Sequence, residues 1–191
     1  MSRSFLHTIR TGAPDGAPFL ILHDRFEVME SAEALGELLG EEATKIAIRS
    51  PRAQSAGGSG ITKGYFWYIG PLDQPELSTL GDGLYQLELL IEETFERYGQ
   101  RKIGLLGAGE GGFVALIAAS FFPDKVQRVV AIDATLPQNL KDMPFEPSLA
   151  GVETVLAYRD MPSADRLAQL EQLGASVTLV PEPELAAFLQ S

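Results

Sequence analysis

The sequence contains no cysteine. Disulfide bonds, thiolate metal sites and a cysteine nucleophile are therefore excluded. Histidine is almost as scarce, because the chain has only two, His7 and His23. Histidine is the usual general base near neutral pH, so candidates for that role are very few. The sequence also lacks any apolar run near the ~18 residues that a bilayer-spanning helix needs.

Basic residues are few as well, with 15 Lys and Arg against 26 Asp and Glu and a net charge of −11. So acidic a surface repels phosphate backbones and anionic lipids, which disfavours nucleic-acid and membrane binding. The first residues lack the apolar core of a secretory signal, so we expect a cytoplasmic protein. The length of 191 residues suits a single domain over residues 1–191. No pair of histidines is spaced for a metal, and we expect neither metal nor cofactor.

Short apolar runs alternate with helical patterns along the chain. Most runs are continuously apolar, which is typical of strands buried on both faces of a parallel sheet. The first two runs flank a turn rich in Gly, Pro and Asp, which predicts an antiparallel hairpin. We therefore expect an α/β fold with a mostly parallel central sheet, an N-terminal antiparallel hairpin and helices on both faces. The expected strands are Phe5–Ile9, Pro18–Leu22, Lys45–Ile48, Ile103–Leu106, Val129–Ile132, Thr154–Ala157 and Val177–Val180, and the expected helices are Val28–Leu39, Gly83–Tyr98, Phe113–Phe122 and Ala164–Leu173.

Residues 51–80 form the one long stretch without clear periodicity. They contain Ala-Gly-Gly-Ser-Gly and then four consecutive aromatic residues, Tyr65 to Tyr68. Loops of this length in a compact domain are usually functional or mobile. Two interpretations stay open: a surface loop anchored by its aromatic side chains, or the wall of a ligand cleft that includes Trp67.

A glycine-rich turn follows the buried run Ile103–Leu106 and opens a helix; it reads Gly-Ala-Gly-Glu-Gly-Gly over residues 107–112. Such a strand–turn–helix is where an α/β-hydrolase holds its nucleophile, in the pattern Gly-x-Ser-x-Gly. Gly107 and Gly111 occupy the two glycine positions, but Gly109 stands where the serine would be. Because glycine has no side-chain atom to attack a carbonyl, the turn predicts the scaffold of an esterase without its reactive atom.

The order of these features over nearly the whole chain resembles the phospholipase/carboxylesterase family of α/β-hydrolases. In that family an apolar strand ends in His-Gly and an oxyanion-hole loop, which correspond here to His23, Asp24 and Arg25. The resemblance implies an oxyanion hole made by the backbone N–H groups of Arg25 and Glu110. It also allows a homodimer, since relatives often pair. The other segments that carry the resemblance are Pro51-Arg52, Gly64–Tyr68, Gly107–Gly112 and Phe122–Val126 followed by Val129–Ile132.

The departures from the family fall on the chemistry. The resemblance assigns the acid of the catalytic triad to Asp160, which precedes Met161-Pro162, and the triad histidine to the position of Glu184. The family's His-Gly has become His23-Asp24, which puts an anion beside a site built to stabilise one. Without a hydroxyl at Gly109 and without a base, the acyl-enzyme route is closed. An oxyanion hole alone retains roughly 10³–10⁴-fold over water, which is trace activity.

The leading hypothesis is therefore a non-catalytic or weakly active homologue whose cleft binds a small acyl or ester-like ligand. A second hypothesis is a carboxylic-ester hydrolase with an altered site built from Glu110, Asp160, Glu184 and His23, since carboxylates serve as nucleophiles in some enzymes. Against it, Glu110 and Glu184 are more simply solvated charges on a helix start and a terminal loop.

A third hypothesis is a dinucleotide-binding module. Gly107, Gly109 and Gly112 spell Gly-x-Gly-x-x-Gly, and Asp133 follows the last of them by 133 − 112 = 21 residues, near the ~20 expected for an acid that binds ribose. However, only two further strands are expected after Asp133, and Glu110 lies in the loop that would receive the pyrophosphate. The tight turn explains the glycines equally well.

Overall fold

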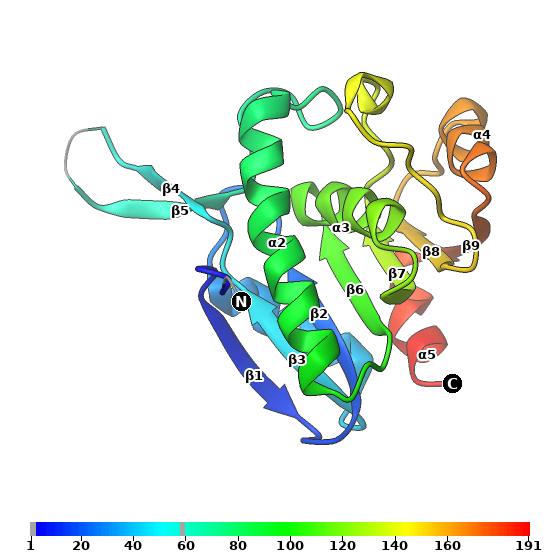
Figure 1. Cartoon of the computed structure of the whole chain (residues 1–191), viewed down its shortest axis with the longest axis horizontal. Coiled ribbons are helices and arrows are strands. Elements are labelled where there is room, and N and C mark those ends of the chain that lie inside the picture. The colour runs from blue at the N-terminus through cyan, green and yellow to red at the C-terminus, as the bar shows by residue number, and fades with distance from the viewer. Residues whose placement is uncertain (1–2, 58–59) are drawn as a thin grey trace.

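The computed structural model describes residues 3–57 and 60–191. A seven-stranded sheet in the order β1-β3-β2-β6-β7-β8-β9 runs through the centre of the molecule (Figure 1). All neighbouring strands in this sheet are parallel except β1 and β3. The strands are β1 (Thr8–Gly12), β2 (Ala17–Leu22), β3 (Ala43–Ile48), β6 (Ile103–Ala108), β7 (Val126–Ile132), β8 (Glu153–Tyr158) and β9 (Ser176–Pro181).

Helices cover both faces of the sheet, as the sequence predicts. One core layer packs α2 (Leu77–Arg97), α3 (Glu110–Phe121) and α4 (Ala164–Gln172) against the sheet. The other packs α1 (Met29–Gly36), the 3-10 turn η1 (Glu37–Leu39) and α5 (Leu185–Leu189) against the opposite face. The two remaining 3-10 turns among the described residues are η2 (Leu140–Asp142) and η3 (Glu182–Glu184). The mostly parallel α/β sheet between two helical layers is thus confirmed.

The first strand is antiparallel, as expected, but the predicted hairpin partner is wrong. β1 lies three residues later than Phe5–Ile9 and pairs with β3, while β2 pairs with the other edge of β3. The turn between β1 and β2 therefore crosses the start of β3, where the N–H of Ala13 donates to the carbonyl of Ala43 at 3.1 Å. The physical reason is burial: the apolar β2 needs a buried neighbour on each side, whereas the exposed residues of β1 suit the edge of the sheet.

Residues 51–80 contain a two-stranded ribbon, β4 (Arg52–Ser55) with β5 (Thr62–Phe66). It projects from the body of the molecule to the left of α2 (Figure 1). The base of the ribbon is bound to the loop after β2, because the N–H of Phe26 donates to the carbonyl of Tyr65 at 2.8 Å and the N–H of Tyr65 donates to the carbonyl of Glu27 at 2.9 Å. The close approach requires Gly64, whose added Cβ would lie 1.9 Å from the Phe26 carbonyl oxygen.

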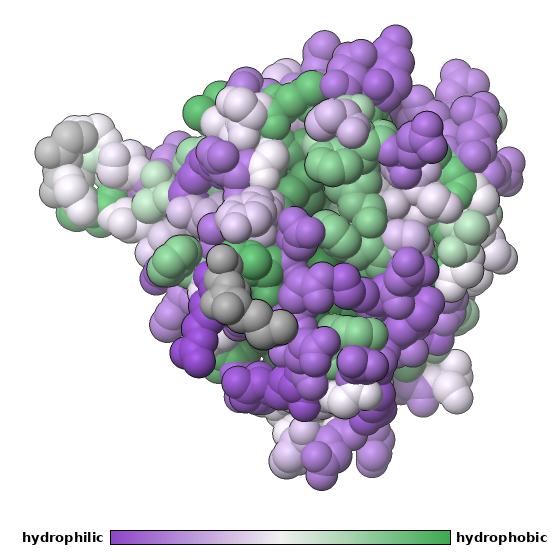
Figure 2. Space-filling view, in the orientation of Figure 1, coloured by the Kyte–Doolittle hydropathy of each residue, from purple (hydrophilic) through white to green (hydrophobic). Residues whose placement is uncertain are grey.

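The face formed by α2 and α3 carries an apolar hollow, visible as a green area between α2 and the segment that follows β7 (Figure 2). Its volume is about 390 Å³, and its lining includes Leu84, Tyr85, Phe121, Phe122 and Phe145. It lies at the C-terminal end of α3, away from the glycine-rich turn that opens this helix. Within the described residues, no helix has the length and hydropathy needed to cross a bilayer.

Candidate functional site

The glycine-rich turn has the sharp geometry expected of a nucleophile elbow. β6 ends at Ala108, α3 begins at Glu110, and Gly109 between them has φ 50° and ψ −120°. A residue with a side chain is rarely found at this φ, and esterases hold their serine in such a strained turn. The Gly109 N–H donates to the carbonyl of Ile132 on β7 at 2.9 Å, which fixes the turn above the sheet.

The neighbouring glycines are explained by close packing of backbone on backbone. A Cβ added to Gly107 would lie 2.3 Å from the carbonyl oxygen of Gly111, and one added to Gly111 would lie 2.4 Å from that of Leu22. A Cβ on Gly112 would meet Ala134 at 2.6 Å. The glycine cluster is therefore required by the contact of the turn with β2, α3 and the residues after β7.

The carboxylate of Asp24 fills the place that a nucleophile side chain would take. The three atoms nearest to a Cβ built on Gly109 all belong to Asp24, with Oδ1 at 2.0 Å. The same Oδ1 accepts the backbone N–H of Glu110 at 2.7 Å and that of Arg25 at 2.6 Å. These are the two N–H groups that the resemblance assigns to the oxyanion hole. The donors are in place, and a carboxylate of the chain itself occupies them.

Glu110 is fully buried, so the prediction that it is a solvated charge is wrong. Its Oε1 accepts from Nε and Nη2 of Arg25 at 2.9 and 2.6 Å, and its Oε2 accepts the backbone N–H of Trp67 at 2.8 Å. Arg25 is itself held, because Nη1 donates to the carbonyl of Gly70 at 2.6 Å and the guanidinium lies 5.0 Å from the centre of the Tyr68 ring. Burial raises the pKa of Glu110, and the bonds from Trp67 and Arg25 offset part of the rise.

His23 stabilises the loop that carries Asp24. Its Nδ1 lies 2.7 Å from the carbonyl oxygen of Asp24, and its Nε2 accepts the backbone N–H of Ser50 at 3.2 Å. A backbone N–H can only donate, so Nδ1 carries the ring proton. Burial lowers the pKa of His23, which keeps the ring neutral near pH 7.

The hydroxyl of Ser50 also lies 3.2 Å from Nε2 of His23. This contact of serine and imidazole lies at the end of β3, which β2 separates from β6 and its elbow. Both residues are buried, with about 1% of each exposed. The pair therefore joins two loops and does not supply a nucleophile at Gly109.

The structure does not assemble the altered hydrolase site. Asp160 is exposed after β8, and Glu184 is exposed in η3. No hydrogen bond or ion pair joins any two of Glu110, Asp160, Glu184 and His23, all of which lie in the described part of the chain. Across residues 3–57 and 60–191, no three histidine or carboxylate side chains are grouped so as to hold a metal ion.

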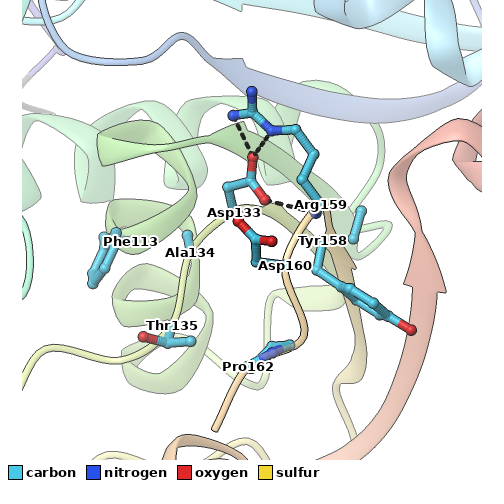
Figure 3. Close-up of a pocket in the computed structure, with 9 residues that line it drawn as sticks. Phe113, Asp133, Ala134, Thr135, Tyr158, Arg159, Asp160 and Pro162 are labelled. Atoms are coloured by element: carbon cyan, nitrogen blue, oxygen red, sulfur yellow. Dashed lines mark hydrogen bonds and ion pairs between the residues drawn. The ribbon is translucent and has the colours of Figure 1, made fainter.

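A cleft of about 440 Å³ opens at the carboxyl ends of β7 and β8 (Figure 3). Asp133, at φ 49°, accepts the backbone N–H of Arg159 at 3.0 Å and its Nε at 2.5 Å. Arg159 also lies 3.3 Å from a carboxylate oxygen of Glu182, so two carboxylates, Asp133 and Glu182, neutralise its charge. The lining residues are Phe113, Asp133, Ala134, Thr135, Ala157, Tyr158, Arg159, Asp160 and Pro162.

Trp67 does not line this cleft, and its assignment to a ligand cleft is wrong. Its side chain is fully buried in the core layer under α2, where its ring lies 3.3 Å from a Cβ built on Gly83. The sequence did not indicate this burial, because the aromatic cluster follows a glycine-rich segment without periodicity. Two of the four aromatic residues, Trp67 and Tyr68, are core residues.

The same contacts disfavour dinucleotide binding at Gly107–Gly112. The N–H of Glu110, which opens α3, already donates to the Asp24 carboxylate, so a negative charge lies where a pyrophosphate would bind. Asp133, the candidate ribose-binding acid, is paired with Arg159.

No protein-family model matches this sequence, and neither does any curated protein. Solved structures do match. A carboxylesterase from Bacillus cereus superposes with a TM-score of 0.73 at 16% identity, over 97% of this chain and 92% of that one. A carboxylesterase from Mesorhizobium loti gives 0.69 at 17% identity, over 93% and 88%, and the structure of YahD with malic acid gives 0.68 at 18%, over 97% of each chain. The chain therefore has the α/β-hydrolase fold of the carboxylesterases.

Proposed function

We propose that this α/β-hydrolase-fold protein binds a small neutral ligand in the cleft beside its elbow and does not hydrolyse esters. The observation that carries the proposal is the Asp24 carboxylate, whose Oδ1 takes the N–H groups of Arg25 and Glu110. Gly109 beneath it offers no nucleophile.

An ester carbonyl can develop negative charge only where free donors face it. In this chain both donors already hold an anion, and a charge-assisted hydrogen bond is worth about 1.5–3 kcal/mol. A substrate oxygen would have to displace Asp24 and would then develop its own charge next to the displaced carboxylate. The wild-type protein thus has no nucleophile at position 109, and its oxyanion hole is filled by Asp24.

The cleft favours a neutral ligand. Phe113, Ala134 and Pro162 give it apolar walls, while Asp160 presents an exposed carboxylate and Arg159 is paired with Asp133. Carboxylate oxygens accept hydrogen bonds from hydroxyl groups, and the walls suit a short acyl chain. The structure of YahD contains malic acid, but the exposed carboxylate of Asp160 would repel a dicarboxylic acid from this cleft.

Binding is tested with glyceryl monobutyrate, a small neutral ester with two hydroxyl groups, by ligand-observed NMR. We expect saturable binding that Asp160→Asn weakens. Asp165→Asn is the matched control, because Asp165 is also exposed but does not line the cleft. Equal binding by all three proteins, or hydrolysis of the ester by wild type, would contradict the proposal.

The lack of hydrolysis is tested by reconstruction. Gly109→Ser alone should stay inactive on p-nitrophenyl butyrate, because its Cβ would lie 2.0 Å from Asp24 Oδ1 and no base is at hand. Adding Asp24→Gly vacates the oxyanion hole. We expect measurable turnover, and stoichiometric labelling by a fluorophosphonate, only when a histidine is also added after β9.

Two positions are compared for that histidine, Glu184→His and Glu182→His. The resemblance favours position 184, whereas only Glu182 contacts the cleft, through Arg159 at 3.3 Å. Turnover or stoichiometric labelling in wild type, or in Gly109→Ser alone, would show that another residue acts as nucleophile or base.

The homodimer and the cytoplasmic location that the sequence suggests stay predictions. Size-exclusion chromatography with light scattering gives the mass in solution, and cell fractionation gives the location.

A further inference from the structure

Three arginines line a pocket of about 380 Å³ at the edge of the sheet opposite the elbow. Arg10 comes from β1, Arg97 is the last residue of α2, and Arg101 lies just before β6. The turn between β1 and β2 closes the pocket with Pro14 and Asp15. Two segments far apart in the sequence, residues 10–15 and 97–101, thus bring three arginines to one pocket.

The end of α2 explains why Arg97 and Arg101 share a pocket. Gly99 and Gln100 both have positive φ, at 67° and 64°. The N–H of Gln100 donates back to the carbonyl of Phe95 at 2.8 Å, which ends the helix in a tight reversal. The chain therefore turns directly after Arg97, and Arg101 returns to the same pocket.

Two of the three guanidinium groups are held in place by neutral partners. The Arg10 guanidinium lies 5.7 Å from the centre of the Tyr98 ring, and Nη1 of Arg101 donates to the backbone carbonyl of Asp15 at 3.1 Å. Neither partner cancels the positive charge. These contacts reduce the mobility of the side chains, so less conformational entropy is lost when a ligand binds.

The positive charge of the pocket is not balanced by carboxylates. Seven of the chain's 15 basic residues form ion pairs within the described residues, but Arg10, Arg97 and Arg101 form none there. Asp15 is the single acidic residue in the lining. The C-terminus of α2 contributes only about half a negative charge. A local excess of positive charge therefore remains in a chain whose net charge is −11.

We propose that Arg10, Arg97 and Arg101 bind the phosphate groups of a small molecule, with pyrophosphate as the simplest representative. Planar guanidinium groups bind phosphate oxygens in pairs, which suits a compact ligand with several negative charges. The net charge of −11 on the chain repels long polyanions, so the ligand is small. This site is separate from the cleft beside the elbow and does not depend on the function proposed for it.

Isothermal titration of pyrophosphate into the whole chain, at constant ionic strength, tests the proposal. We expect one saturable site, with a Kd at least ~10-fold higher in Arg10→Gln and ~100-fold higher in Arg97→Gln/Arg101→Gln, because each tenfold corresponds to about 1.4 kcal/mol. Arg49→Gln is the matched control, since Arg49 also stacks on a tyrosine, 4.8 Å from the centre of the Tyr65 ring, but lies outside the pocket. It should keep the wild-type Kd.

Two further titrations identify the source of the phosphate. Inorganic phosphate and ATP compete for the same pocket, and tighter binding of ATP than of pyrophosphate would assign a nucleotide. The proposal is overturned by the absence of saturable binding for all three anions, or by an equal loss in Arg49→Gln, which would indicate diffuse attraction. Because Arg10, Arg97 and Arg101 are exposed, circular dichroism should show wild-type folding of their variants; if the double variant does not fold, Arg10→Gln alone decides.

Discussion

Replacing Gly109 by alanine tests whether a side chain at the elbow and the Asp24 carboxylate exclude each other. The added Cβ would lie 2.0 Å from Asp24 Oδ1, so the carboxylate has to move away. It then loses the N–H groups of Glu110 and Arg25, which it binds at 2.7 and 2.6 Å. With Asp24→Ala already present, the same Cβ enters space that no carboxylate fills.

The expected free energies follow from these contacts. A non-glycine residue at φ 50° costs about 1–3 kcal/mol of backbone strain in either background. Loss of the carboxylate that caps α3 costs about 0.5–2 kcal/mol. Gly109→Ala in wild type suffers both losses, whereas in Asp24→Ala it suffers the strain alone. The double variant should therefore have nearly the same free energy of unfolding as Gly109→Ala, so the coupling equals the loss of the carboxylate contact, about 0.5–2 kcal/mol.

Urea denaturation followed by circular dichroism measures the four proteins of this cycle. Gly99→Ala is the control, because Gly99 also has a positive φ, 67°, and an added Cβ meets nothing within 4 Å. Its strain should add to the effect of Asp24→Ala without coupling. If Gly109→Ala and Asp24→Ala were additive within about 0.5 kcal/mol, Asp24 would not occupy the nucleophile's place.

Two further predictions concern the residues around Asp24. Arg25→Met leaves the Glu110 carboxylate buried without its cation and should cost about 3–5 kcal/mol in urea unfolding, part of which Arg25→Met/Glu110→Gln recovers; a loss below about 1 kcal/mol would refute this. Burial lowers the pKa of His23 from its usual value of about 6.5. The imidazole therefore binds a proton more tightly in the unfolded chain than in the folded one. The folded state loses stability as the pH falls from about 6.5 toward the lowered pKa. In His23→Gln the urea midpoint should depend less on pH between about pH 7.5 and 5 than it does in wild type.

The spacing of apolar residues within a segment predicted those helices and strands whose buried face is set by neighbouring residues in the sequence. The pattern over residues 164–173 predicted α4 almost to the residue, because its apolar positions and the following Gly174 are read from neighbouring residues. The partner of β1 could not be predicted in this way, since pairing with β3 depends on which strands need burial on both sides. The ribbon of β4 and β5 was missed because its residues show neither alternation nor a run of apolar side chains.

The same distinction separates what the sequence revealed of the site from what it did not. Gly109 was identified as the elbow because a strand, a glycine turn and a helix follow one another directly. The bond from Glu110 N to Asp24 spans 86 residues, and the bond from Arg25 to Glu110 spans 85. A lone glutamate at a helix start is usually solvated, and only the fold shows that Arg25 reaches it.

A side chain at position 109 and the Asp24 carboxylate in its present position therefore exclude each other. The glycine and the aspartate belong to one arrangement. A serine at position 109 would bring its Cβ within 2.0 Å of Asp24 Oδ1, so the carboxylate can fill the oxyanion hole only above a glycine. Two acidic residues, Asp24 and Glu110, then meet at the N-terminus of α3, and Arg25 balances one while the helix N–H groups hold the other. The contacts of Asp24, Arg25 and Glu110 support one another, so we expect that a serine at position 109 alone gives no esterase activity. We expect activity only where Asp24 is also removed and Arg25 keeps its place beside Glu110.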